Sequence, residues 1–178
     1  MTKRLYALAI VLIMSAQAFG STTSFLRDAV KDRTITPEKV QSLIKSGADV
    51  RTPNKHGVTV LMNAAMSSTA QIVKILVEAG ADVKAADSLG NTVLAYAAEG
   101  NTYPDVVRIL VDAGADVNVP DKDGVTPLMK AAKRPNNAYI VNALIEAGAD
   151  IYAEDKDGRT ALSYADPGMR HIIINAVK

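Results

Sequence analysis

A four-residue phrase returns almost unchanged along this chain, at intervals of 33, 34 and 34 residues. A period of that length is typical of stacked helical pairs, in which each pair buries its apolar face against its neighbours. A second glycine follows ten residues after each first one, so the connector between units has a constant length. The chain is therefore predicted to be a linear array of similar units. The phrases are Gly47-Ala48-Asp49-Val50, Gly80-Ala81-Asp82-Val83, Gly114-Ala115-Asp116-Val117 and Gly148-Ala149-Asp150-Ile151, and the second glycines are Gly57, Gly90, Gly124 and Gly158.

Within each unit the pattern predicts a helix, a loop, a second helix and a projecting turn. A threonine precedes each first helix, where its hydroxyl can accept a backbone N–H as an N-cap. The second helices carry apolar residues at three- and four-residue spacing and end at the glycine of the phrase, which suits a left-handed backbone position. The one-residue difference in period falls in the loop between paired helices. The threonines are Thr59, Thr92, Thr126 and Thr160, and the second-helix cores are Ile72-Val73 with Leu76, Val106-Val107 with Leu110, and Ile140-Val141 with Leu144.

With these features the chain resembles the ankyrin repeat family over roughly residues 24–177. The resemblance implies an all-α repeat solenoid of stacked helix-turn-helix repeats with projecting β-hairpin-like turns. One departure concerns the His that follows Thr-Pro-Leu in the family and links neighbouring connectors by hydrogen bonds. Because that position holds Met62, Ala95, Met129 and Ser163 here, the network between repeats is expected to be different or weaker. The residues that carry the resemblance are Asp121-Lys122-Asp123-Gly124-Val125-Thr126-Pro127-Leu128, Ala131-Ala132, Ile140-Val141, Leu144 and Gly148-Ala149-Asp150, with Gly57-Val58-Thr59-Val60-Leu61 and Gly90-Asn91-Thr92-Val93-Leu94.

The N-terminus has the layout of a secretory signal peptide. Lys3 and Arg4 precede an apolar run from Leu5 to Met14, and small residues follow up to Ala18. The run is too short to span a bilayer, and the chain has no Cys to carry a lipoprotein anchor. Cleavage is expected after Ala18, which places the product in a bacterial periplasm or outside the cell. The alternative is a buried N-terminal helix.

The predicted organisation is a signal peptide over residues 1–18 and one ankyrin repeat domain over residues 19–178. The domain is divided into an N-terminal cap at about 24–53, repeats at about 54–86, 87–120 and 121–153, and a C-terminal cap at about 154–178, the caps having polar outer sides as solenoid ends need. Cleavage changes 20 bases against 19 acids to 18 against 19, a net charge of −1. This balance argues against nucleic-acid partners and against membrane anchoring after cleavage. We expect the domain by itself to be monomeric.

Catalytic chemistry finds little support in the sequence. The chain has two histidines, His56 and His171, at opposite ends of the array, and none of the common nucleophile, phosphate-loop or zinc motifs. The Asp-x-Asp-Gly segments at Asp121 and Asp155 look like fragments of a calcium loop but lack the remaining ligands, so they are interpreted as turns. Met62 and Met66, one helical turn apart, are interpreted as core or contact residues in preference to Cu(I) ligands. No enzyme activity and no cofactor are predicted.

The resemblance implies that the turns and the open side of the first helices form the protein-binding surface. Leu89, Met66 and Tyr96 are the least expected residues for a plain solvated face, and Tyr96, Tyr103 and Arg134 are the leading anchors because interface hot spots favour aromatic residues and Arg. Asn63 is also predicted to lie on the open side of its first helix. The predicted contact residues are Lys55, His56, Val58, Met66, Ser88, Leu89, Asn91, Tyr96, Glu99, Tyr103, Lys122, Asp123, Val125, Lys130, Lys133, Arg134, Lys156, Asp157, Arg159 and Tyr164.

The function predicted from these features is that of a non-catalytic periplasmic protein-binding module. Its most specific form is a stoichiometric inhibitor or immunity partner of an exported enzyme such as a cell-wall hydrolase. The alternatives are a stabiliser of an exported oxidative-stress enzyme, a secreted effector that binds host proteins, and a binder of a metal or small ligand.

Overall fold

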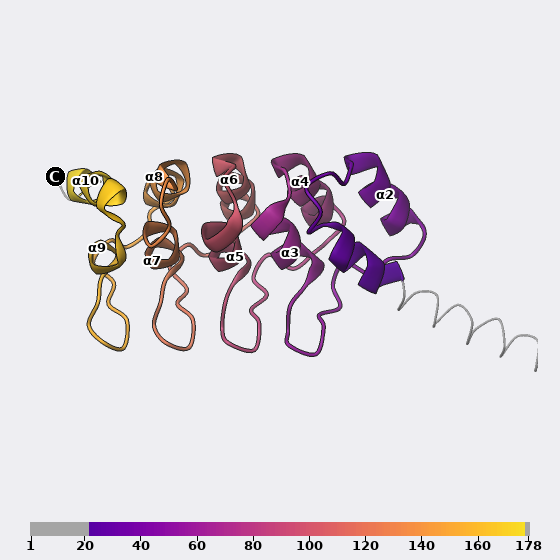
Figure 1. Cartoon of the computed structure of the whole chain (residues 1–178). Helices are drawn as coiled ribbons and strands as arrows, with labels where there is room; N and C mark the ends of the chain where they lie inside the picture. Colours follow the sequence, from indigo (N-terminus) through magenta and orange to yellow (C-terminus); the bar gives the residue numbers. More distant parts are fainter. Residues whose placement is uncertain (1–21, 177–178) are drawn as a thin grey trace, which may run out of the picture.

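Helical pairs lie side by side in one row in the computed structural model, which describes residues 22–176 (Figure 1). The first helices contact the first helices of neighbouring pairs, and the second helices contact second helices, so the fold is the all-α repeat solenoid that was predicted. The predicted signal peptide lies outside the described residues. The pairs are residues 22–29 with α2 (Pro37–Lys45), α3 (Val60–Ser67) with α4 (Ala70–Glu78), α5 (Val93–Gly100) with α6 (Pro104–Asp112), α7 (Pro127–Ala132) with α8 (Ala138–Glu146), and α9 (Ala161–Tyr164) with α10 (Pro167–Ala176).

Loops that project below the helices connect one pair to the next (Figure 1). These loops are hairpin-like in shape, but within residues 22–176 their backbone forms one isolated bridge, between Ala86 and Thr92, and no strand. The loop that joins α5 to α6 is one residue longer than the loop that joins α3 to α4, as the sequence predicted.

The predicted N-caps are confirmed for three first helices. Thr59 Oγ1 accepts the Met62 backbone N–H at 3.2 Å, and Thr92 and Thr126 make the equivalent bond with donors three residues further on. In the fourth, the Thr160 backbone N–H donates to Ser163 Oγ at 3.3 Å. The second helices α2, α4, α6 and α8 are each followed, as expected, by a glycine with positive φ, between 86° and 93° for Gly47, Gly80, Gly114 and Gly148.

The methionines at the family's His position complete these N-caps. Met62 Sδ accepts the Thr59 backbone N–H at 3.4 Å, and Met129 Sδ accepts that of Thr126 at the same distance. Both methionine side chains are buried. A buried N–H therefore finds a weak sulfur acceptor inside its own repeat.

Buried polar side chains link the second, third and fourth pairs to the pair before each of them. Asn101, in the loop between α5 and α6, donates from Nδ2 to the carbonyls of Ala65 at 2.7 Å and Ser68 at 3.0 Å. Its Oδ1 accepts two backbone N–H groups of its own loop, both at 2.8 Å. In the neighbouring loops Ser68 donates to the Val30 carbonyl, and Asn137 donates to that of Ala98 at 3.2 Å. A carbonyl in or directly after the last turn of each of these first helices is therefore satisfied by the next loop.

The terminal pairs differ in how well they close the array. The N-terminal pair forms as predicted, with Thr36 Oγ1 accepting the Lys39 N–H at 3.3 Å and Pro37 in the first turn of α2. At the other end Met169 and Ile173 of α10 are buried, while Ala176 at the end of the helix is exposed. The expected polar outer side is wrong there, because Leu162 and Ile174 are also exposed. Within residues 22–176, no helix has the length and apolar character needed to cross a membrane.

Asn101→Ala should lower the free energy of unfolding by about 2–3 kcal/mol, because two buried carbonyls and two N–H groups lose their partner. Urea denaturation followed by circular dichroism measures this loss. Asn142→Ala, at an exposed position of α8, is the matched control and should change stability by less than about 0.5 kcal/mol. Equal effects of the two substitutions would contradict the structural role of Asn101.

Gly100→Ala should also destabilise the array, because a Cβ at Gly100 would lie 2.5 Å from the Met66 carbonyl oxygen and still closer to Met66 Cγ. A side chain can move aside but the backbone of α3 cannot, so we expect a loss of about 1–3 kcal/mol, visible as a lower melting temperature in calorimetry. Gly168→Ala, which meets only a side-chain oxygen at 3.3 Å, is the control. An unchanged melting temperature for Gly100→Ala would show that α3 and α5 do not approach this closely.

Candidate functional site

Each projecting turn is closed by one side-chain oxygen that lies three residues before its glycine. Asp87 Oδ1 accepts the backbone N–H groups of Leu89 at 2.8 Å and Asn91 at 2.9 Å. Asp121 and Asp155, which resembled fragments of a calcium loop, hold their own turns in the same way, as the turn interpretation proposed. The equivalent oxygens belong to Asn54, Asp121 and Asp155, each with two backbone donors at 2.9–3.0 Å.

Neighbouring turns are joined through their main chains. The Ser88 N–H donates to the His56 carbonyl at 2.9 Å, Lys122 to Leu89 at 3.0 Å, and Lys156 to Asp123 at 3.1 Å. Glycine is required at this spacing, since a Cβ on Gly90 would lie 3.0 Å from the Lys122 nitrogen and one on Gly124 would lie 2.9 Å from Asp155 Cα. Main-chain bonds therefore join neighbouring connectors at the turns. The side chains at the turn tips take no part in them.

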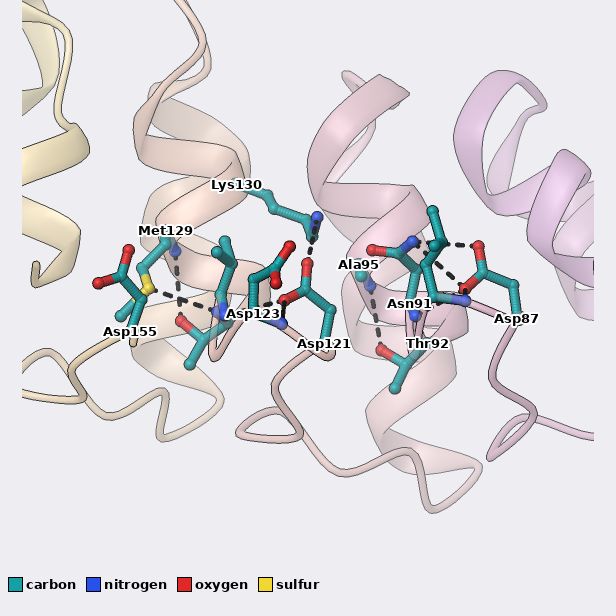
Figure 2. A network of polar contacts seen from close by, with 12 residues as sticks. Asp87, Asn91, Thr92, Ala95, Asp121, Asp123, Met129, Lys130 and Asp155 are labelled. Carbon is teal, nitrogen blue, oxygen red and sulfur yellow. Dashed lines mark hydrogen bonds and ion pairs between the residues drawn. The ribbon is translucent and has the colours of Figure 1, made fainter. Parts of the chain in front are cut away.

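The second oxygen of each aspartate is held by a donor on the following first helix. Asp87 Oδ2 accepts the Tyr96 hydroxyl at 2.9 Å. Asp121 Oδ2 lies 2.9 Å from Lys130 Nζ, as Figure 2 shows. Asp155 Oδ2 accepts the Tyr164 hydroxyl and the Arg159 guanidinium at 2.9 Å. Tyr96, Lys130, Arg159 and Tyr164, all predicted contact residues, therefore also support the turns. The neutral Asn54 has no such partner on α3. Asn63, nine residues after Asn54, donates to the Arg27 carbonyl instead and is buried. The prediction that Asn63 lies on the open side of its helix is therefore wrong.

Hydrogen bonding controls the protonation of these groups. Burial alone would raise the pKa of Asp87, but the bonds from Asn91, Leu89 and Tyr96 outweigh it and lower that pKa. The pKa of Asp155 is lowered in the same way, with burial outweighed by Tyr164 and Arg159. Burial, with the bond to Asp87 next in size, raises the pKa of Tyr96. Both carboxylates are therefore charged, and Tyr96 remains a neutral donor, throughout the physiological range.

A groove of about 550 Å³ lies beside the third turn and along α7, between Glu99 of α5 and Tyr164 of α9. Its lining includes Val125, Met129, Pro135 and Tyr164 together with charged residues of both signs. Lys130 is already paired with Asp121, and Arg134 donates to the Glu99 carbonyl. The structure brings seven predicted contact residues together here, and sequence reasoning missed Asp121, Met129 and Pro135. The predicted residues that line it are Glu99, Asp123, Val125, Lys130, Lys133, Arg134 and Tyr164.

The remaining predicted residues divide between the turn tips and the helix ends. The exposed tip residues are Lys55, His56, Ser88, Leu89, Lys122, Lys156 and Asp157, with Val58 and Asn91 half-buried at the bases of their turns. Leu89 is 64% exposed, the most exposed leucine among those in residues 22–176. Met66 lies against Gly100 at the end of α5, and Tyr103, half exposed, precedes α6 away from the turns. We call the tips together with the groove the turn–helix face.

The turn–helix face offers shape and charge for recognition. Among residues 22–176, no group of three or more His, Asp or Glu side chains is placed to hold a metal ion. Met62 Sδ faces the Thr59 N–H, and Met66 packs on Gly100. This arrangement is suited to binding. Leu89 and the apolar residues that line the groove supply apolar contact. Glu99, Asp123 and Lys133 supply charges that are in no ion pair within the described residues.

Replacing both Asp87 and Asp155 by Asn should make the stability of the fold less dependent on pH below neutrality. Both folded-state pKa values lie below the unfolded value of about 3.9, so their contribution to stability is complete above that pH and is lost as the pH falls from there toward the folded-state pKa values. Melting temperatures from pH 6 to pH 2.5 should therefore fall less in the double variant than in the wild type. A variant with Asp112→Asn and Glu154→Gln removes two exposed carboxylates and should keep the wild-type slope.

Two family models match the chain. One, described as ankyrin repeats in three copies, covers residues 26–121, and the other, described as ankyrin repeats in many copies, covers residues 110–165. No curated protein matches the chain in a sequence search. Ankyrin repeats are protein–protein interaction modules, generally without catalytic activity, and the first model alone covers more than half of the 178 residues. The matched repeats, together with the stacked helical pairs and glycine turns described above, show that this chain belongs to the ankyrin repeat family.

Proposed function

We propose that this protein is a non-catalytic, exported binding module that inhibits an exported enzyme, such as a cell-wall hydrolase, by covering its active site. The observation that carries the proposal is the groove beside the third turn, on the same face as exposed tip side chains that the bonds between turns do not use. A loop beside the active-site cleft of the enzyme can enter the groove of about 550 Å³. The turn tips then contact the rim of that cleft.

The supporting physics is that of preorganisation. Because main-chain bonds and aspartate oxygens hold the turns, the binding surface loses little conformational freedom when a partner docks. The uncommitted groups are of mixed character: Leu89 is apolar, Glu99 is acidic and Lys133 is basic. A central apolar contact with charges around it is the usual composition of a protein interface.

Export is part of the proposal and rests on the charged, apolar and small-residue layout of residues 1–18. An exported chain meets exported enzymes, and it contains no Cys that an oxidising compartment could cross-link. Fractionation of the source cells tests this part by itself, with the N-terminal residue of the recovered chain expected to be Phe19.

The binding test is an affinity purification from periplasmic extract with the chain that begins at Phe19, followed by mass spectrometry. One exported enzyme should be retained, and its activity should fall to a minimum at one equivalent of the chain. A variant with Leu89→Ala, Glu99→Ala and Lys133→Ala should lose the enzyme, because these side chains lie on the turn–helix face and make no bond within the described structure that an alanine would break.

The matched control carries Tyr139→Ala, Glu78→Ala and Lys74→Ala on the exposed sides of the second helices. It also loses one apolar, one acidic and one basic side chain, so its net charge equals that of the test variant. If both variants retain the enzyme equally, the binding site does not lie on the turn–helix face. An enzyme that is retained but gains heat resistance without loss of activity would favour the stabiliser of an exported enzyme over the inhibitor.

A further inference from the structure

The last repeat exposes a leucine that every earlier repeat buries. Leu61, Leu94 and Leu128 follow their N-cap threonines by two residues and are 0%, 1% and 0% exposed, since the next pair packs against them. Leu162 holds the same position after Thr160 and is 38% exposed. Ile174 of the neighbouring α10 is 46% exposed. The outer side of this repeat therefore has the character of a stacking surface.

Two connector positions repeat the contrast. Asn118 bridges to the following repeat, donating to the Gly148 carbonyl at 3.2 Å and accepting the Asp150 N–H at 2.7 Å. Its equivalent one period later, Tyr152, is 65% exposed. Gly158 has the positive φ of the other turn glycines, yet a Cβ there would have no atom within 4 Å among the described residues. We call Tyr152, Gly158, Leu162 and Ile174 the end face.

The opposite end of the array cannot complement this face. Within residues 22–176, the projecting turns all follow the N-terminal pair, residues 22–29 with α2, and none precedes it to meet Gly158 (Figure 1). Its exposed positions are mainly polar, with Phe25 as the large apolar exception. They include Ser24, Asp28, Lys31, Glu38, Lys39, Gln41 and Ser42. A head-to-tail contact would set an apolar stacking surface against charged helices.

A second end face is the complementary surface that remains, and charge permits the contact. Residues 152–176 hold four acids against three bases, so two copies would not repel strongly. The acids are Glu154, Asp155, Asp157 and Asp166, and the bases are Lys156, Arg159 and Arg170. A contact of like with like about a two-fold axis closes on itself and does not grow into a fibre.

We propose that two copies of this chain associate through their end faces, with Leu162 and Ile174 at the centre and Tyr152 at the rim. The contact continues the stacking that already joins the repeats and leaves both turn–helix faces open. The apolar area is small for an interface, so the dimer is weak and its population depends on protein concentration.

Light scattering coupled to size-exclusion chromatography, from about 5 µM to about 500 µM of the purified processed chain, tests this. The mass should rise from that of one chain toward that of two, but not beyond. Leu162→Arg with Ile174→Arg should keep the mass at one chain over the whole range. Leu89→Arg, at a tip residue that is more exposed than either, should leave the rise unchanged.

Circular dichroism melting of the double variant confirms that it folds, and a single spin label provides a readout that needs no disruptive change. Because the chain contains no Cys, Asn175→Cys and Ser24→Cys each create one labelling site, on α10 and on the N-terminal helix. At high concentration, labels at position 175 should show a short intermolecular distance and labels at position 24 should not. A mass of one chain at every concentration, or a short distance only at position 24, would overturn the proposal.

Discussion

The whole array depends on hydrogen bonds that cross from one repeat to the next at both ends of the first helices. At one end, Ser68, Asn101 and Asn137 donate to a carbonyl in or directly after the last turn of the preceding first helix. At the other end, the turn N–H groups donate to the carbonyls of the preceding turns. These groups are backbone acceptors that a single repeat would leave without a partner, so each repeat completes its neighbour. The apolar layers between them supply the driving force, and these bonds set the spacing.

Much of this arrangement could be predicted from the sequence because the period makes each position appear four times. The Gly-Ala-Asp phrase, the N-cap threonines and the apolar spacing gave helix starts, helix ends and the stacking direction. The same reasoning failed at the last repeat, where Leu162 follows the period but no further helix in the described chain covers it. Periodicity shows what a position resembles, whereas burial depends on what lies beside it in space.

The candidate site was harder to predict, since exposure of a first-helix side chain does not show whether the fold already uses it. Tyr96, Lys130 and Tyr164 occupy the open side of their helices but hold turn carboxylates. Their nine-residue spacing from Asp87, Asp121 and Asp155 was visible in the sequence. It became informative only once the turns were seen to leave one oxygen of each carboxylate free. Met62 and Met129 are similar, because a thioether in place of His gave no hint that sulfur would accept the N-cap N–H.

The turns combine a main chain that is fixed with tip side chains that are not. Because glycine, one aspartate or asparagine oxygen and the neighbouring carbonyl define each turn, positions such as Lys55, His56, Ser88 and Leu89 contribute almost nothing to folding. Substitutions of these side chains should change the stability of the fold very little, whereas they can change the affinity for a partner strongly. Such a chain could change its target through a few substitutions at these tips, one turn at a time, while the rest of the molecule remains the same.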